Sequence, residues 1–162
     1  MAAFREITLG GLLRETAANY PEREALVYPA TGLRLNYRQF AEECVKAAKG
    51  FMALGIEKGD HVSVWTTNLP EWLYLQFGLG MIGAVLVTIN TNYKSHDLKY
   101  IVRQSDSTTL VFMEGYRDTN YYETIQACVP ELARSPAPGN LAAADLPFLR
   151  NLVYIGSRQE TP

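Results

Sequence analysis

The sequence predicts an α/β protein: a parallel sheet covered by helices on both faces, forming a three-layer unit, with a helix and a β-hairpin before it. The first observation is alternation. Helical patterns separate short apolar, β-branched runs near residues 62–66, 85–89, 109–113 and 152–155. Such alternation with right-handed crossovers makes the strands parallel neighbours. The second observation is that no charged residue occurs between Glu71 and Lys94, which indicates a helix and a strand buried on both faces.

This uncharged stretch also resembles a membrane span in length, since a span needs about 20 apolar residues. Polar residues interrupt it, however, and glycines lower its helix propensity. The polar residues are Gln76, Thr88, Asn90, Thr91 and Asn92. A hydrophobic content of 48% for the whole chain is also ordinary for a globular domain. We therefore expect no transmembrane segment.

A third interpretation is a dinucleotide-binding loop, because residues 78–84 read G-x-G-x-x-G-A. That motif needs a strand before it and a helix that begins within it. Here the order is reversed. Asn68 is the expected N-cap, followed by Pro70 in the first turn and Glu71 at the capping-box position. We expect a helix of about Leu69–Ile82 that ends at Gly83, followed directly by a strand of about Ala84–Ile89.

Before this stretch, the sequence predicts a helix, a hairpin and a second helix. The first helix is capped by Thr8 and stopped by Pro21. The hairpin strands are residues 25–28 and 33–36. Asn36 then caps the second helix, with Gln39 at the capping-box position and Gly55 just beyond its end.

After this stretch, Ser95 is the expected cap of a short helix, and residues 121–128 form another helix that ends before Pro130. Strands of residues 61–66, 108–113 and 152–155 complete the sheet. Residues 130–150 are rich in Ala and Pro and indicate an irregular excursion.

Composition excludes several classes of function. The 162 residues suffice for one domain with a core, and a net charge of -2 gives no reason to expect nucleic acid. Cys44 and Cys128 fall at apolar helical positions, so we expect buried free thiols and a cytoplasmic protein. The first six residues do not begin a secretory signal.

No catalytic or metal-binding motif is present. His61 and His96 lack metal-ligand spacing, and neither a G-x-S-x-G elbow nor a G-x-x-x-x-G-K-[ST] phosphate loop occurs. Ligands of open parallel sheets bind beyond the carboxyl ends of the strands. Those ends are residues 66–68, 90–93 and 114–117. Asn90 and Asn92 can donate and accept hydrogen bonds, and Arg117 can pair with a phosphate, although Asn in such loops often only forms turns.

Several segments resemble the core motifs of the adenylate-forming (AMP-binding) enzymes. Residues 35–40, LNYRQF, are similar to the first core motif, L-T-Y-x-x-L/F. Residues 54–62, LGIEKGDHV, are similar to L-G-x-x-x-G-D-x-V. Residues 68–72 and 83–90 resemble the second core motif. The resemblance runs from about Leu9 to Gly156 and is strongest to the fatty-acyl-CoA synthetase group, whose loop I-N-P-x-Y reads I-N-T-N-Y here, with Thr91 in place of proline.

The resemblance implies a fold like the first subdomain of the acyl-CoA synthetases. In that family, ATP with Mg activates a carboxylic or fatty acid as an acyl adenylate, which CoA converts to a thioester. By order and spacing, Asn90, Thr91, Asn92 and Arg117 correspond to residues near the CoA nucleotide. The ATP phosphate loop, the catalytic residues and the C-terminal domain have no counterpart in residues 1–162.

We therefore expect an N-terminal portion of the large domain of an AMP-dependent ligase that is not competent alone. We also expect it to form a homo-oligomer, through surface that is internal in the complete enzyme. Two alternatives stay open at this point: a free-standing dinucleotide-binding module and an oligomerisation domain.

Overall fold

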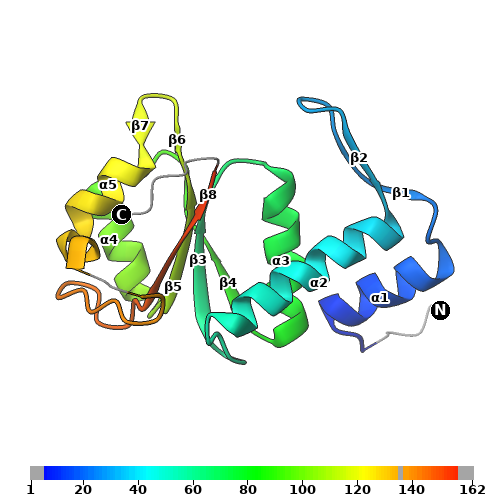
Figure 1. The fold of residues 1–162 in the computed structure, drawn as a ribbon, viewed down its shortest axis with the longest axis horizontal. Coiled ribbons are helices and arrows are strands. Elements are labelled where there is room, and N and C mark those ends of the chain that lie inside the picture. Colours follow the sequence, from blue (N-terminus) through cyan, green and yellow to red (C-terminus); the bar gives the residue numbers. More distant parts are fainter. Residues whose placement is uncertain (1–5, 135–136, 157–162) are drawn as a thin grey trace.

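A parallel four-stranded sheet forms the centre of the structure, a computed structural model that describes residues 6–134 and 137–156 (Figure 1). The strands lie in the order β4 (Val85–Thr88), β3 (His61–Trp65), β5 (Thr109–Met113) and β8 (Asn151–Ile155). Each neighbouring pair is parallel. The predicted strands and their direction are confirmed.

Helices cover both faces of this sheet, so the predicted three-layer arrangement is confirmed (Figure 1). On one face, Val62, Val64 and Val111 pack with side chains of α2 (Tyr37–Ala53) and α3 (Pro70–Ile82). On the other face, Trp65 and Phe112 pack with α4 (Ser95–Gln104) and α5 (Tyr121–Cys128). Successive strand residues point to opposite faces, which is why one strand supplies both cores.

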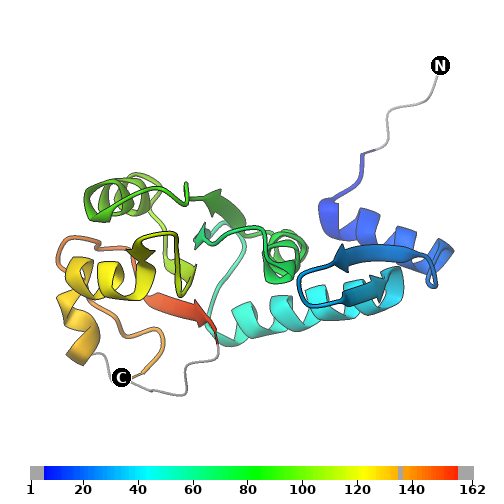
Figure 2. The same ribbon diagram turned by 90° about the horizontal axis from the view of Figure 1, so that it is seen from above.

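The N-terminal helix and hairpin pack outside the sheet, beside the first half of α2 (Figure 2). Helix α1 (Leu9–Asn19) begins after Thr8, whose Oγ1 accepts a hydrogen bond from the Gly11 N–H at 3.1 Å. The hairpin pairs β1 (Glu24–Tyr28) with β2 (Leu33–Asn36). Leu13, Phe40 and Cys44 form the buried centre of this part.

The predicted capping box of α2 is present. The Asn36 side chain accepts from the Gln39 N–H at 2.9 Å, and the Gln39 side chain accepts from the Asn36 N–H at 3.0 Å. Gly55, just after the helix, has a φ of 78°.

The predicted start of α3 is wrong by one residue. The N-cap is Leu69, with φ -93° and ψ 158°, and no side chain caps this helix. Because Pro70 occupies the first helical position, the residue before it is held extended and becomes the N-cap. Asn68 therefore lies outside the helix, and Glu71 is not part of a capping box. The predicted end is confirmed: Gly83 has a φ of 76°.

Three other predictions need correction. Ser95 is the first residue of α4 rather than its cap; instead the Asp97 carboxylate accepts from the Lys94 N–H at 3.2 Å. Strand β4 is not buried on both faces, since it lies at the sheet edge and Val85 is 43% exposed. Within the excursion, residues Pro130–Arg134 form a short 3-10 helix, η1.

The sequence also missed a small hairpin, β6 (Gly115–Tyr116) and β7 (Thr119–Asn120), directly after β5. Two-residue strands are too short to show any periodicity. This hairpin lies at the carboxyl end of the sheet.

Candidate functional site

The loops that follow β4 and β5 meet at the carboxyl edge of the sheet, where the β6–β7 hairpin projects (Figure 1). Lys94, after β4, donates a hydrogen bond from Nζ to Thr119 Oγ1 of the hairpin. The same Nζ lies 3.8 Å from Asp118 Oδ1. These contacts join the residues directly after two of the three segments that the sequence singled out, residues 90–93 and 114–117.

The loop after β4 forms a tight turn around Asn90. The Asn90 Oδ1 accepts from the Asn92 N–H at 2.9 Å, and the Tyr93 N–H donates to the Asn90 carbonyl at 3.1 Å. Asn90 therefore stabilises a turn, as asparagine in such loops often does. Both Asn90 and Asn92 are exposed, and the Asn92 Nδ2 also donates to the Asn90 Oδ1 at 3.3 Å.

Two buried aromatic residues hold the backbone of this loop from inside. The Trp65 indole Nε1 donates to the Asn90 carbonyl at 3.0 Å, and the Tyr121 hydroxyl donates to the Thr91 carbonyl at 2.6 Å. The two rings stack with centroids 3.5 Å apart and planes 9° apart. Burial, with a smaller effect of Tyr116, raises the pKa of Tyr121 to about 12, so its hydroxyl keeps the proton at neutral pH.

Sequence reasoning missed both aromatic residues. Trp65 reads as the last apolar residue of a strand, and Tyr121 as the first apolar residue of a helix. Their contact joins distant parts of the chain, so no local pattern could indicate it. The sequence offered one general indication that these residues make hydrogen bonds: a buried Trp N–H or Tyr O–H usually finds a hydrogen-bond partner.

Arg117 lies at the exposed tip of the β6–β7 hairpin with a φ of 53°. Its guanidinium carbon lies 5.1 Å from the centroid of the Tyr116 ring. Among the described residues, no carboxylate forms an ion pair with Arg117. Its positive charge is therefore available to an anion, although no hydrogen bond within the described chain joins it to residues 90–92.

The third predicted segment, residues 66–68, is held by β5 instead. The Thr67 N–H and Oγ1 lie 3.2 and 3.4 Å from the sulfur of Met113. Nearby, the Tyr154 hydroxyl bonds to the Glu114 carboxylate and so links the ends of β8 and β5.

The glycine run does not form a ligand-binding loop. Gly78 and Gly80 lie inside α3, so their N–H groups are within the helix. A Cβ at Gly78 would lie 3.1 Å from atoms of Ala47, Ala48 and Cys44 on α2. The glycines therefore allow close helix packing, and the dinucleotide-binding alternative is wrong.

The two histidines lie apart, as expected. His61 Nδ1 is 2.5 Å from the Ser105 carbonyl, at the amino end of β3, and His96 is exposed on α4. Over residues 6–134 and 137–156, no three His, Cys, Asp or Glu side chains cluster as metal ligands do. Within the same residues, no helix combines the length and the apolar character that a membrane span needs.

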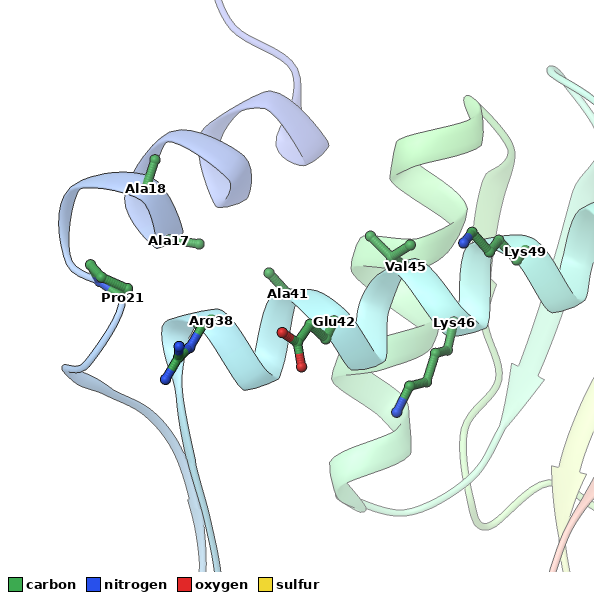
Figure 3. Close-up of a pocket in the computed structure, with 9 residues that line it drawn as sticks. All are labelled: Ala17, Ala18, Pro21, Arg38, Ala41, Glu42, Val45, Lys46 and Lys49. Atoms are coloured by element: carbon green, nitrogen blue, oxygen red, sulfur yellow. The ribbon is translucent and has the colours of Figure 1, made fainter.

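A groove of about 650 Å³ lies elsewhere, between α1 and α2 (Figure 3). Ala41 and Val45 of α2 and Ala17 of α1 line it, and Arg38, Lys46 and Lys49 lie around it. Arg38 and Lys46 are paired with Glu22 and Glu43. The groove is well separated from the carboxyl edge of the sheet (Figure 1).

Residues 13–155 match the family described as AMP-binding enzyme. The chain belongs to this family. The AMP-binding assignment made from the core motifs is thus confirmed, and so is the closer resemblance to the acyl-CoA synthetases. A Bacillus subtilis protein named as the acyl-CoA synthetase YngI is 46% identical over 159 residues, which is 98% of this chain and 29% of YngI.

Two further comparisons agree with this family assignment. The human mitochondrial medium-chain acyl-CoA ligase ACSF2 is 33% identical over 91% of this chain and 24% of its own length. The N-terminal domain of FACL13 from Mycobacterium tuberculosis superposes with a TM-score of 0.75 at 26% identity, over 92% of this chain and 34% of that chain. The chain thus spans less than a third of the curated relatives' length and corresponds to an N-terminal portion of an acyl-CoA ligase.

Proposed function

We propose that this chain supplies the N-terminal part of the large domain of an AMP-dependent acyl-CoA synthetase. In the complete enzyme, ATP with Mg would convert a carboxylic or fatty acid to an acyl adenylate, and CoA would take the acyl group as a thioester. Family membership and the acyl-CoA relatives support the reaction class. No Mg ligand is proposed within the described residues, where no three His, Cys, Asp or Glu side chains cluster as metal ligands do.

The role we propose for the carboxyl edge is recognition of CoA by Asn90, Thr91, Asn92 and Arg117. The observation that carries this role is that the loop after β4 is joined to the hairpin segment after β5, through the Lys94–Thr119 and Tyr121–Thr91 hydrogen bonds. CoA presents phosphates and an adenine. An exposed guanidinium that has no carboxylate partner among the described residues suits a phosphate, and exposed amides can donate to and accept from the base.

The test is a titration of the chain with CoA, followed by calorimetry or by amide chemical shifts. We expect Arg117→Ala to weaken CoA binding about tenfold, the effect of losing a charge-assisted hydrogen bond. Arg14→Ala is the matched control, because Arg14 is an exposed arginine on α1, away from this edge. Equal affinity of the Arg117 variant and the wild type would remove Arg117 from the proposal.

We expect the 162-residue chain alone to form no acyl adenylate, since it spans 29% of the length of YngI. Exchange of labelled pyrophosphate into ATP in the presence of fatty acids measures this step directly. Exchange by the isolated chain above the protein-free blank would contradict the expectation.

We further propose that the chain forms homo-oligomers at concentrations of tens of micromolar. Exposed apolar side chains support this: Val45 and Met52 are exposed on α2, and Val85 lies in β4, the edge strand of the described sheet. Light scattering coupled to size exclusion, across a dilution series, would decide it. A monomer at every concentration would contradict the proposal.

The location we propose is the cytoplasm. The two cysteines, Cys44 and Cys128, are both free and buried, which suits a reducing compartment. Fractionation of the source cells, with detection of the chain by antibody, would test this, and recovery with membranes or in the medium would contradict it.

A further inference from the structure

Tyr121 makes two contacts that join the loop after β4 to the hairpin after β5. Its hydroxyl donates to the Thr91 carbonyl at 2.6 Å. Its backbone N–H donates to the Glu114 carbonyl at 3.0 Å, at the base of the hairpin. One residue therefore fixes both segments of the carboxyl edge.

The stacked Trp65 ring keeps the Tyr121 hydroxyl in place. Both side chains are fully buried, and their rings are parallel within 9°. Their polar tips reach successive carbonyls, Trp65 to Asn90 and Tyr121 to Thr91. Neither ring can turn away without opening the core beneath it, because buried side chains are closely packed.

The exposed side of the same edge has a weaker connection. Lys94 Nζ bonds to Thr119 Oγ1, but the Lys94 side chain itself is 59% exposed. The ion pair of Lys94 with Asp118 is exposed on both sides, so it contributes little and is screened by salt. The buried contact through Tyr121 is thus the one able to hold the loop and the hairpin at a constant separation.

We propose that Tyr121, stacked on Trp65, is a positioning residue that sets the loop carrying Asn90 and Asn92 relative to the hairpin carrying Arg117. The two segments then present their amides and guanidinium to one anionic ligand. The identity of this ligand, CoA, rests on the proposed function, whereas the positioning does not. Tyr121 itself touches no ligand.

The experiment uses Tyr121→Phe, which deletes one hydroxyl and keeps the ring. Tyr100→Phe is the matched control, because the Tyr100 side chain is exposed on α4 and its hydroxyl has no hydrogen bond within the described chain. Hydrogen exchange of the Trp65 indole N–H and the Tyr93 amide, measured by NMR, reports on the loop. The Trp72 indole N–H, on α3, is the internal reference.

We expect Tyr121→Phe to accelerate exchange of the Trp65 indole N–H and the Tyr93 amide about fivefold, the effect of losing one ordinary hydrogen bond. Trp72 and the amides of β3 and β5 should not change. Unchanged exchange at Trp65 would overturn the inference. So would equal acceleration throughout the protein, because Tyr121 would then only stabilise the core. Restoring a donor with 4-aminophenylalanine at position 121 should restore slow exchange.

A second arm adds CoA and follows the same resonances. The expected result is that CoA shifts the loop and hairpin resonances of the wild type and binds Tyr121→Phe about fivefold more weakly. This result would support the proposal that Tyr121 positions the two segments for CoA. Equal affinity of the two proteins would overturn that role. If the wild type itself shows no shift, the proposed CoA site fails, while the exchange measurement still decides whether Tyr121 positions the loop.

Discussion

Gly78 of α3 lies directly against the backbone of α2 at Cys44, so that a Cβ at Gly78 would be 3.1 Å from the Cys44 carbonyl oxygen. The same Cβ would be 3.1 Å from the backbone nitrogen of Ala48. Backbone atoms cannot move aside as a flexible side chain can. The absence of a side chain at position 78 therefore sets how closely the two helices approach.

We expect Gly78→Ala to destabilise the protein by about 1–2 kcal/mol, because overpacking outweighs the better helix propensity of alanine. Gly50→Ala is the matched control. Gly50 lies within α2 with no atom near the position of an added Cβ, so that variant should be stabilised by about 0.5–1 kcal/mol. Urea unfolding measures both, and effects of the same sign would contradict the packing argument.

Asn36 and Asn68 give a second contrast. Asn36 caps α2 through the Gln39 N–H at 2.9 Å, so Asn36→Ala should cost about 1 kcal/mol of unfolding free energy. Asn68 caps nothing, and Asn68→Ala should change stability by less than about 0.5 kcal/mol. Thermal unfolding of the two variants side by side checks this, and equal costs would argue for a cap at Asn68 after all.

The buried Cys44 thiol predicts a loss of stability at alkaline pH. Burial, and then the nearby Glu43, raises the pKa of Cys44 from 9.0 to about 12. The unfolded chain releases this proton from about pH 9, whereas the folded chain keeps it until near pH 12. The protonated Cys44 thiol therefore contributes its full stabilisation below pH 9. As the pH rises above 9, the free energy of unfolding falls, by about 1 kcal/mol at pH 10.

The measurement is urea unfolding between about pH 8 and pH 10, for the wild type and Cys44→Ala. The variant is expected to be less stable overall but to depend less on pH, since the other titrating groups are shared. Parallel pH curves for the two proteins would show that the Cys44 thiol titrates normally in the folded state.

Arg117 and Asp106 are the two residues other than glycine with positive φ in the described chain, 53° and 50°. Glycine adopts this conformation without the penalty of about 1–2 kcal/mol that a side chain brings. We expect Arg117→Gly and Asp106→Gly each to stabilise the fold by up to about 1 kcal/mol in denaturant unfolding. Only Arg117→Gly should weaken CoA binding, because Asp106 lies at the amino end of β5, opposite the candidate site.

The sequence correctly predicted those features that depend on residues close together in the chain. The Asn36 and Gln39 pair, the glycine that ends α3 and the strand–helix alternation all act within a few residues. The cap at Asn68 was wrong because the restriction that Pro70 places on Leu69 outweighs the capping preference of asparagine.

The contacts that build the candidate site are long-range and could not be predicted. Nothing near Trp65 in the sequence indicates that it stacks on Tyr121, and the β6–β7 hairpin is too short to leave a pattern. The position of the candidate site follows from the topology, because parallel strands end at one edge, and it stays a prediction. The assignment of CoA to Asn90, Thr91, Asn92 and Arg117 stays a prediction.

Helix α2 contributes to two separate hydrophobic clusters. Its first half supplies Phe40 and Cys44 to the cluster with α1 and the hairpin, and its last turn supplies Phe51 to the cluster under the sheet (Figure 1). A helix of 17 residues is a rod about 25 Å long. Because one continuous helix joins the α1–hairpin part to the sheet, we expect the outer part of the molecule and the sheet to move together as one body.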